Sequence, residues 1–315
     1  MLRAFVFPGQ GSQAVGMGRA LGDAFPVARA VYLEVDDALG QNLSALMAEG
    51  PGDALTLTEN AQPALMAVSM AVVRILESRG LDLATAASFV AGHSLGEYAA
   101  LCAAGALSIT DTARLLRIRG RAMQQAVPVG EGAMAALLGL DLEEARAIAA
   151  EAARDGGVCQ AANDNAPGQV VISGSLAAVE RAIAIAVGRG ARRPVMLPVS
   201  APFHCALMQP AADAMAEALA SVAIAPPVVP VVANVTATAV QDPDTIRRLL
   251  VEQVTGAVRW RESVLYMKEQ GVTELVECGA GKVLTGLARR IDRDMSAQAL
   301  NTPEDIDAFF TTSVA

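Results

Sequence analysis

The chain is poor in aromatic residues and in positive charge. Phe, Trp and Tyr make up 3% of its 315 residues, and 33 acidic residues outnumber 24 basic ones, which gives a formal net charge of -9. A protein with this charge repels the phosphate backbone of nucleic acids. We therefore expect no nucleic-acid partner.

Long hydrophobic runs and clustered cysteines are also missing. No uncharged apolar run reaches the roughly 18 residues of a membrane-spanning helix, and only about four apolar residues precede Pro8, too few for a signal-peptide core. The four cysteines form no C-x-x-C pair, which argues against a disulfide framework or a zinc site. We expect a cytoplasmic protein with no membrane contact and no bound metal.

Helical and strand-like segments alternate along the chain, which predicts an α/β architecture. Residues 2–7 predict a strand, and residues 60–79 predict a helix with Pro63 in its first turn. Residues 274–278, ELVEC, predict the last core strand.

The order of elements changes between residues 129 and 198. Here the pattern reads βαββαβ, which is the order of a ferredoxin-like subdomain. Its first strand is expected near GAMAALLGL and its last at RRPVMLPVS. We therefore predict a small ferredoxin-like domain at 129–198 inserted into a large domain formed by residues 1–128 and 199–315.

GHSLG, residues 92–96, follows an apolar strand and precedes a helix of small residues. This is the context of the G-x-S-x-G nucleophile elbow of α/β-hydrolases. Ser94 would stand at a helix N-terminus, where the amide of Leu95 can stabilise an anion. We expect an α/β-hydrolase-like large domain with a parallel central sheet, and a nucleophilic Ser94 rather than a serine that only caps the helix.

A serine nucleophile needs a base, and the chain has only two histidines. His93 adjoins Ser94 in the tight turn, so its ring should project away, which leaves His204. No acidic residue between Ser94 and His204 is well placed to orient the ring; Asp164, for instance, is expected in a turn. A backbone carbonyl could accept from the second ring nitrogen instead.

Residues 111–126 predict a helix that carries four arginines. A solvated helix face is the simpler interpretation for three of them: Arg114, Arg117 and Arg121. Arg119 has Ile118 and Met123 as neighbours, which suggests a partly buried flank. A buried guanidinium needs an anionic partner, and a substrate carboxylate would serve.

The opening stretch FVFPGQGSQAVGMG, residues 5–18, has the G-x-G-x-x-A outline of a dinucleotide-binding turn. That interpretation requires an acidic residue about 20 positions on, at the end of a second strand. Asp36 and Asp37 are at this distance, but their surroundings predict a helix, and Pro8 interrupts the turn. A nicotinamide-dependent oxidoreductase is therefore the weaker alternative.

Eight ordered blocks together resemble the malonyl-CoA:acyl-carrier-protein transacylases. They are FVFPGQGSQ, TENAQPALMAV, GHSLGEYAAL, RGRAMQQAVPVGEGAMAALLG, NAPGQVVISG, PVSAPFHCALM, PVVANV and GAGKVLTGL. The resemblance covers nearly the whole chain. It implies transfer of a malonyl group from malonyl-CoA to the phosphopantetheine thiol of acyl carrier protein, in ping-pong order, through a malonyl-serine intermediate. We expect no permanently bound cofactor, since the CoA thioester is a substrate.

The resemblance also implies roles for individual residues. Ser94 takes up the malonyl group, His204 acts as general base and acid, and Arg119 grips the free carboxylate. The oxyanion hole falls on Gln10, through its side chain or backbone, and on the amide of Leu95.

Other implied site residues surround this set. The main-chain carbonyl of Gln253 resembles one that orients the histidine, which would explain the missing acid. Asn163 matches a pocket asparagine, although Asn165 lies two positions away. Met123 and Phe203 are expected to line the same substrate pocket.

Two positions depart from the family pattern. Ala280 replaces a common proline, a loop change without effect on the chemistry. Phe203 is bulkier than the small residue usual in the fatty-acid enzymes and resembles the malonyl-selective acyltransferases of polyketide synthesis. Supply of fatty-acid synthesis is our expectation, with a trans-acting polyketide acyltransferase as the alternative.

Two further functions remain open, a serine esterase or thioesterase and a non-catalytic acyl-CoA-binding module. An acidic carrier protein that docks on an acidic enzyme requires a local basic patch. Arg289 and Arg290 are candidates for it, as are Arg192 and Arg193. We expect the chain to be a monomer.

Overall fold

The computed structural model describes residues 2–313. A six-stranded sheet forms the large domain, with the strand order β10-β9-β1-β2-β7-β8. The strands are β1 (Arg3–Phe7), β2 (Phe89–Gly92), β7 (Val231–Val232), β8 (Ala239–Val240), β9 (Glu274–Cys278) and β10 (Ser296–Leu300). All neighbours pair in parallel except β7 and β8. The expected parallel central sheet is confirmed.

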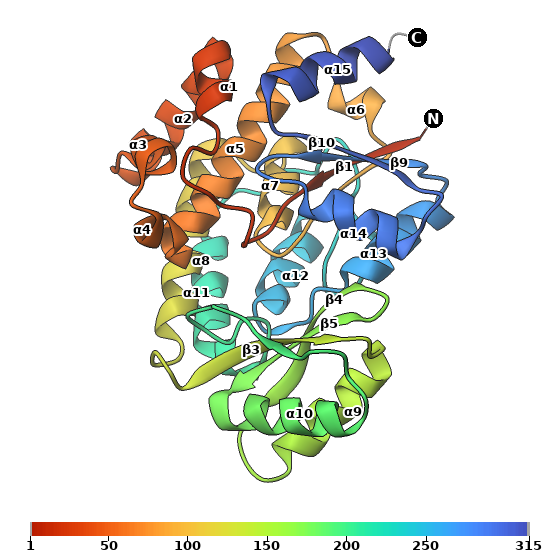
Figure 1. Cartoon of the computed structure of the whole chain (residues 1–315). Coiled ribbons are helices and arrows are strands. Elements are labelled where there is room, and N and C mark those ends of the chain that lie inside the picture. Colours follow the sequence, from red (N-terminus) through yellow and green to blue (C-terminus); the bar gives the residue numbers. More distant parts are fainter. Residues whose placement is uncertain (1, 314–315) are drawn as a thin grey trace.

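Helices cover both faces of this sheet (Figure 1). The helices of the large domain that precede β7 in the chain are α1 (Arg19–Ala24), α2 (Pro26–Leu39), α3 (Leu43–Glu49), α4 (Gly52–Thr56), α5 (Thr58–Ser78), α6 (Leu83–Ala86), α7 (Gly96–Ala103), α8 (Ile109–Gln125) and α11 (Gln209–Ala220). The short 3-10 helix η1 (Ala206–Met208) comes directly before α11. Those that follow β7 are α12 (Pro243–Thr255), α13 (Trp260–Glu269), α14 (Val283–Ile291) and α15 (Pro303–Ser313).

The side chains of β1 alternate between two cores. Phe5 and Phe7 pack in the cluster that includes residues of α2, α5, α7 and α8. Ala4 and Val6 pack on the opposite side with residues of α13 and α14. This alternation follows from the two-residue period of a strand, and it explains why β1 is apolar from Ala4 to Phe7: both faces of this part are buried.

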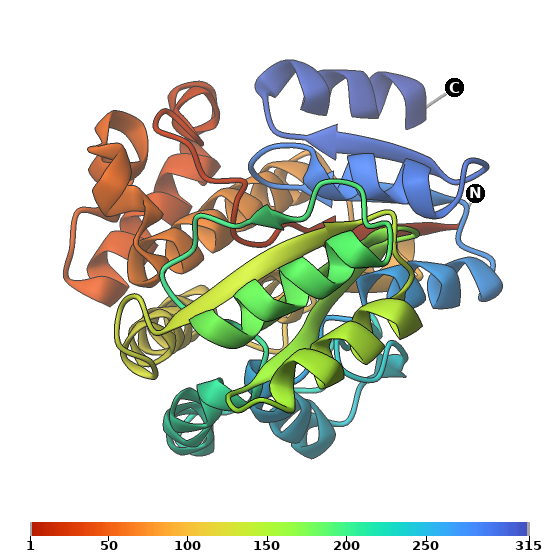
Figure 2. The same cartoon turned by 60° about the horizontal axis from the view of Figure 1, so that its bottom comes forward.

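A second sheet lies beside the large domain, with α9 (Leu142–Ala153) and α10 (Leu176–Gly188) on its outer face (Figures 1 and 2). Its strands are β3 (Gly132–Leu138), β4 (Cys159–Ala166), β5 (Gln169–Ser175) and β6 (Val195–Met196). The order β4-β5-β3-β6 with antiparallel pairing is that of a ferredoxin-like unit. All four strands fall inside the range 129–198.

Several predicted element bounds were wrong. ELVEC is not the last strand, because β10 pairs with it in parallel at the sheet edge. The helix expected from residue 60 begins at Thr58, since the amides of Asn60 and Ala61 donate to the carbonyl of Leu57, so Pro63 lies beyond the first turn. The strand expected at RRPVMLPVS shrinks to two residues, because proline cannot donate to a ladder.

Within residues 2–313, no helix is both long enough and apolar enough to cross a bilayer. All four cysteines are buried free thiols.

Candidate active site

The loops after β1 and β2 meet because these strands are parallel neighbours, so their carboxyl ends lie at the same edge of the sheet. The turn after β2 holds Ser94 in the left-handed region, with φ 54°. A Cβ on Gly92 would lie 1.9 Å from the main chain of Gly96, and a Cβ on Gly96 would lie 2.2 Å from the carbonyl oxygen of Phe7. Only glycine fits at either position, so the G-x-S-x-G spacing has a steric cause here.

Asn234, in the loop after β7, holds the serine turn in place. Its Oδ1 accepts from the amide of Ser94 at 2.7 Å, and its Nδ2 donates to the carbonyl of Gly92 at 2.7 Å. Asn234 is buried. The residue lies in the PVVANV block, but no pattern in the sequence pairs it with the elbow.

His204 lies beside Ser94. Its Nε2 is 2.7 Å from Ser94 Oγ, and its Nδ1 is 2.9 Å from the carbonyl oxygen of Gln253 and 3.1 Å from that of Gly256. Carbonyl oxygens only accept, so Nδ1 carries the proton and Nε2 is left to accept from the serine. The structure thus places the Gln253 carbonyl where sequence resemblance expects it, and no carboxylate is needed to orient the ring.

Burial lowers the pKa of His204 to about 3, and the positive charge of Arg119 acts in the same direction. The ring is therefore neutral near pH 7. A neutral imidazole that hydrogen-bonds a serine hydroxyl can accept its proton directly.

Arg119 projects from α8 into the same site and is only 1% exposed. Its Nη1 donates to Gln62 Oε1 at 2.8 Å, and its Nη2 lies 2.9 Å from Gln253 Oε1 and 3.2 Å from Ser94 Oγ. Within residues 2–313, every one of these acceptors is uncharged. A buried guanidinium 3.2 Å from a serine hydroxyl, with these neutral groups as its acceptors, can take an anionic ligand.

Two expectations for the neighbours of Arg119 were wrong. Arg117 is buried rather than solvated, and it lies 3.8 Å from Glu59. Ile118 is 41% exposed, so it does not form a buried flank. Helix α8 packs against both α5 and α11, which buries more of its circumference than one apolar stripe predicts.

The first glycine-rich loop approaches the elbow closely. A Cβ on Gly9 would lie 2.8 Å from the carbonyl oxygen of His93, so glycine allows this contact. Gln10 and Leu95 both line the cavity around Ser94. In the part of the chain that the structure describes, neither main-chain amide has an acceptor. The side-chain Oε1 of Gln10 accepts from Thr58 at 2.9 Å, while its main-chain amide and its side-chain Nε2 are both donors.

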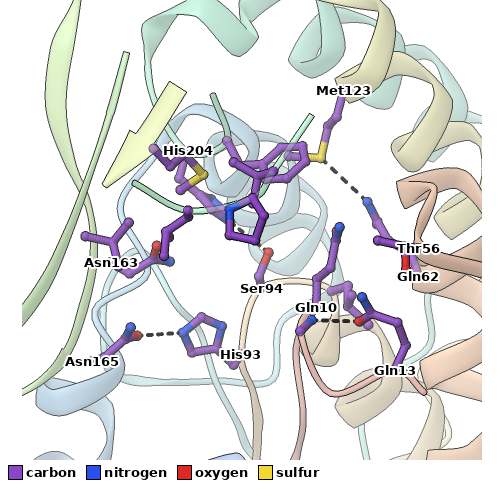
Figure 3. Close-up of a pocket in the computed structure, with 18 of the residues that line it drawn as sticks. Gln10, Gln13, Thr56, Gln62, His93, Ser94, Met123, Asn163, Asn165 and His204 are labelled. Carbon is purple, nitrogen blue, oxygen red and sulfur yellow. Dashed lines mark hydrogen bonds between the residues drawn. The ribbon is translucent and has the colours of Figure 1, made fainter. Parts of the chain in front are cut away.

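A cavity of about 470 Å³ opens over Ser94 between the two domains (Figure 3). The predicted pocket residues Met123, Asn163 and Phe203 all line it. Gln62, which the sequence analysis missed, also lines it, and its Nε2 lies 3.8 Å from the sulfur of Met123. The signal for Gln62 was its place in the TENAQPALMAV block.

The ring of His93 points away from Ser94, as expected. Its Nε2 is 2.8 Å from Asn165 Oδ1 (Figure 3). Its ring centroid lies 5.8 Å from that of Trp260. Asp164 is not a turn residue. It lies in β4, is buried, and forms an ion pair with Arg261.

The candidate docking arginines are all exposed. Arg289 and Arg290 occupy the last turn of α14, and Arg290 donates to Gln169 of the small domain at 2.8 Å. The turn before α14 adjoins the first loop, since a Cβ on Gly281 would contact Ser12 at 3.5 Å. Arg192 and Arg193 lie before β6, on the small domain.

Residues 4–300 match the family model described as "Acyl transferase domain". The malonyl CoA-acyl carrier protein transacylase of Escherichia coli (strain K12) is 48% identical over 305 residues, which cover 97% of each chain. The crystal structure of acyl-carrier-protein-S-malonyltransferase from Bartonella henselae is 58% identical, with a TM-score of 0.97 and full coverage of both chains.

A type II PKS acyl-carrier protein has been solved in complex with its malonyl-transacylase. That structure is 44% identical, with a TM-score of 0.96, and covers 99% of this chain and 100% of the other. Taken with the serine, histidine and arginine gathered in one cavity, these matches show that the chain belongs to the malonyl CoA-acyl carrier protein transacylase family.

Proposed function

We propose that this chain transfers a malonyl group from malonyl-CoA to the phosphopantetheine thiol of an acyl carrier protein. The observation that carries the proposal is the buried guanidinium of Arg119, 3.2 Å from the hydroxyl of Ser94. An acyl group attached to Ser94 and ending in a carboxylate would supply the anion that Arg119 lacks. An uncharged acyl group would leave the guanidinium without a charged hydrogen-bond acceptor.

In the first half-reaction, Ser94 Oγ attacks the thioester carbonyl while His204 Nε2 takes its proton. The amides of Gln10 and Leu95 donate to the oxyanion. The carbon–sulfur bond then breaks, and the CoA sulfur leaves with the proton that His204 returns. The product is a malonyl ester on Ser94, with its carboxylate at Arg119.

In the second half-reaction, the thiol of the carrier's phosphopantetheine arm attacks the ester. His204 takes the thiol proton and returns it to Ser94 Oγ, which restores the free enzyme. The same base and the same oxyanion donors thus serve both half-reactions of the ping-pong transfer.

The setting of the reaction follows from the same features. We propose supply of fatty-acid synthesis, with trans-acting polyketide supply as the alternative that Phe203 suggests. A cytoplasmic location is supported by four unpaired thiols, and action as a monomer by the fact that Ser94, His204 and Arg119 all come from one chain. The CoA thioester is a substrate rather than a bound cofactor.

Rapid mixing with malonyl-CoA and phosphopantetheinylated acyl carrier protein tests the proposal. We expect malonyl-carrier to form faster than free malonate, because the acyl-serine ester is passed to a thiol. The carrier with its phosphopantetheine serine replaced is the control. Free malonate as the main product, with the carrier unloaded, would instead indicate a thioesterase.

We propose that the exposed arginines Arg289 and Arg290 contribute to docking of the acidic carrier. Reversal of both to glutamate is expected to raise KM for the carrier by about tenfold while KM for malonyl-CoA changes less than about twofold, because rim charges act mainly on encounter. Arg154→Glu, at the end of the outer helix α9, is the matched control. Equal effects on both substrates would exclude this docking site.

A further inference from the structure

Glu97 is a buried carboxylate behind the active site, and the proposed mechanism makes no use of it. It lies in the first turn of α7, three residues after the nucleophile, and is 2% exposed. A buried carboxylate is costly unless it is hydrogen-bonded or paired with a positive charge. Its contacts therefore indicate what it does.

Glu97 Oε2 accepts two hydrogen bonds, one from the amide of Asn234 at 3.0 Å and one from Gln253 Nε2 at 2.8 Å. Asn234 is the residue that holds the serine turn through its side chain. Gln253 is the residue whose carbonyl accepts from His204. The carboxylate thus binds both supports of the nucleophile and base.

Gln253 also connects Glu97 with Arg119. Its side-chain Nε2 donates to Glu97 and to the carbonyl of Ser94 at 2.9 Å, while its Oε1 accepts from Arg119 Nη2 at 2.9 Å. A carboxylate on Nε2 fixes which way this amide points, because the oxygen must then face the guanidinium. With the amide turned over, two donors would face each other at Arg119.

We propose that Glu97 is a positioning residue that holds Arg119 ready for the substrate carboxylate, acting through the oriented side-chain amide of Gln253; this inference rests on the proposed malonyl transfer. The contacts run from the Glu97 carboxylate through the Gln253 amide to the Arg119 guanidinium. The carboxylate is the end farther from the cavity, and the guanidinium is the end that faces it. Loss of the charge on Glu97 weakens one of the two acceptors that hold the Gln253 amide, the other being the Ser94 carbonyl, and so holds Arg119 less firmly.

The protonation of Glu97 is consistent with such a role. Burial raises its pKa to about 7, against the lowering effects of the Asn234 amide, Gln253 and Arg119. The charged or titratable groups that act on it are Arg119 of α8 and Tyr98 of α7. The charged carboxylate, on which the proposed role depends, is therefore the main form only above about pH 7.

Glu97→Gln tests the proposal, with single-turnover loading of malonyl and acetyl groups from their CoA thioesters as the readout. At pH 8 we expect malonyl loading to fall about tenfold and acetyl loading less than about threefold, since acetyl makes no use of Arg119. In an Arg119→Ala background, Glu97→Gln should change malonyl loading less than about twofold, because the interaction partner is gone.

The pH profile gives a second readout. In the wild type, the ratio of malonyl to acetyl loading should fall as the pH drops through about 7, because protonation neutralises Glu97. In Glu97→Gln the ratio should stay low and flat. His204, whose pKa is about 3, cannot produce a change in that range.

Glu277→Gln is the matched control. Glu277, in β9, is also a buried carboxylate, and it accepts from the amides of Leu284 and Thr285 in the first turn of α14. The Glu277→Gln variant should leave the ratio of malonyl to acetyl loading, and the pH profile of that ratio, unchanged.

Equal losses of malonyl and acetyl loading in Glu97→Gln, in both backgrounds, would mean a structural role only and would overturn the inference. Malonyl and acetyl loading rates in Glu97→Gln equal to those of the wild type would also overturn the inference. If the wild-type protein forms no malonyl adduct at all, the proposed function fails instead.

Discussion

Ser94→Ala is expected to abolish the malonyl adduct that forms when the protein is exposed briefly to malonyl-CoA. The hydroxyl lies 2.7 Å from His204 Nε2, and no other group at this point can carry the acyl chain. Transfer to the carrier should fall by about 10⁴-fold or more, because the remaining oxyanion donors and binding contacts cannot replace a nucleophile. Intact-mass spectrometry and carrier loading measure the two effects.

Ser12→Ala is the control for this experiment, since Ser12 lies in the first loop near the cavity and also has a hydroxyl. It should retain the adduct and the loading rate. A malonyl adduct of normal yield on the Ser94→Ala protein would contradict the nucleophile assignment. Normal function without any adduct in the wild type would instead favour an acyl-CoA-binding module.

Arg119→Ala is expected to remove the preference for malonyl over acetyl. The variant loses the only buried positive charge that contacts Ser94 in residues 2–313. The second-order rate constant for loading from malonyl-CoA should therefore fall about 10²- to 10³-fold. Acetyl loading should change by no more than a few fold, because an acetyl group has no carboxylate to bind. Competition between the two thioesters, followed by mass spectrometry, measures the ratio.

Arg121→Ala separates this effect from a general loss of charge on α8. Arg121 is exposed and pairs with Glu59 on the surface, so its removal should leave the malonyl preference intact. Thermal unfolding of both variants checks that α8 remains folded. Malonyl preference retained in Arg119→Ala would remove Arg119 from the binding role.

Much of the site was predictable because its signals are local. The glycines on either side of Ser94 are required by contacts within one strand-turn-helix unit, and the scarcity of histidine left His204 as the only base. The βαββαβ order likewise predicted the ferredoxin-like sheet, since its topology follows from the alternation of elements along the chain. These features depend either on residues that are close in the sequence or on the choice between only two histidines.

The predictions that were wrong concern the burial of side chains and the pairing of strands. Strand β10 is only partly buried and carries small and polar residues, so its sequence lacks the apolar pattern of a core strand, and its place at the sheet edge comes from pairing with β9. Arg117 was assigned to a solvated face because helical spacing does not reveal that α8 packs against more than one neighbour.

The turn around Ser94, the choice of His204 as its partner and the alternating α/β pattern were all predictable from the sequence, because each depends on local geometry or on residue type. Which polar groups meet inside the protein depends instead on tertiary packing. Helix α7 is buried along its whole length, so nothing in its periodicity distinguishes Glu97. Its link to Arg119 runs through Gln253 of α12, which is far from both α7 and α8 in the chain. Long-range contacts of buried polar side chains depend on how the layers pack, which local sequence patterns do not encode.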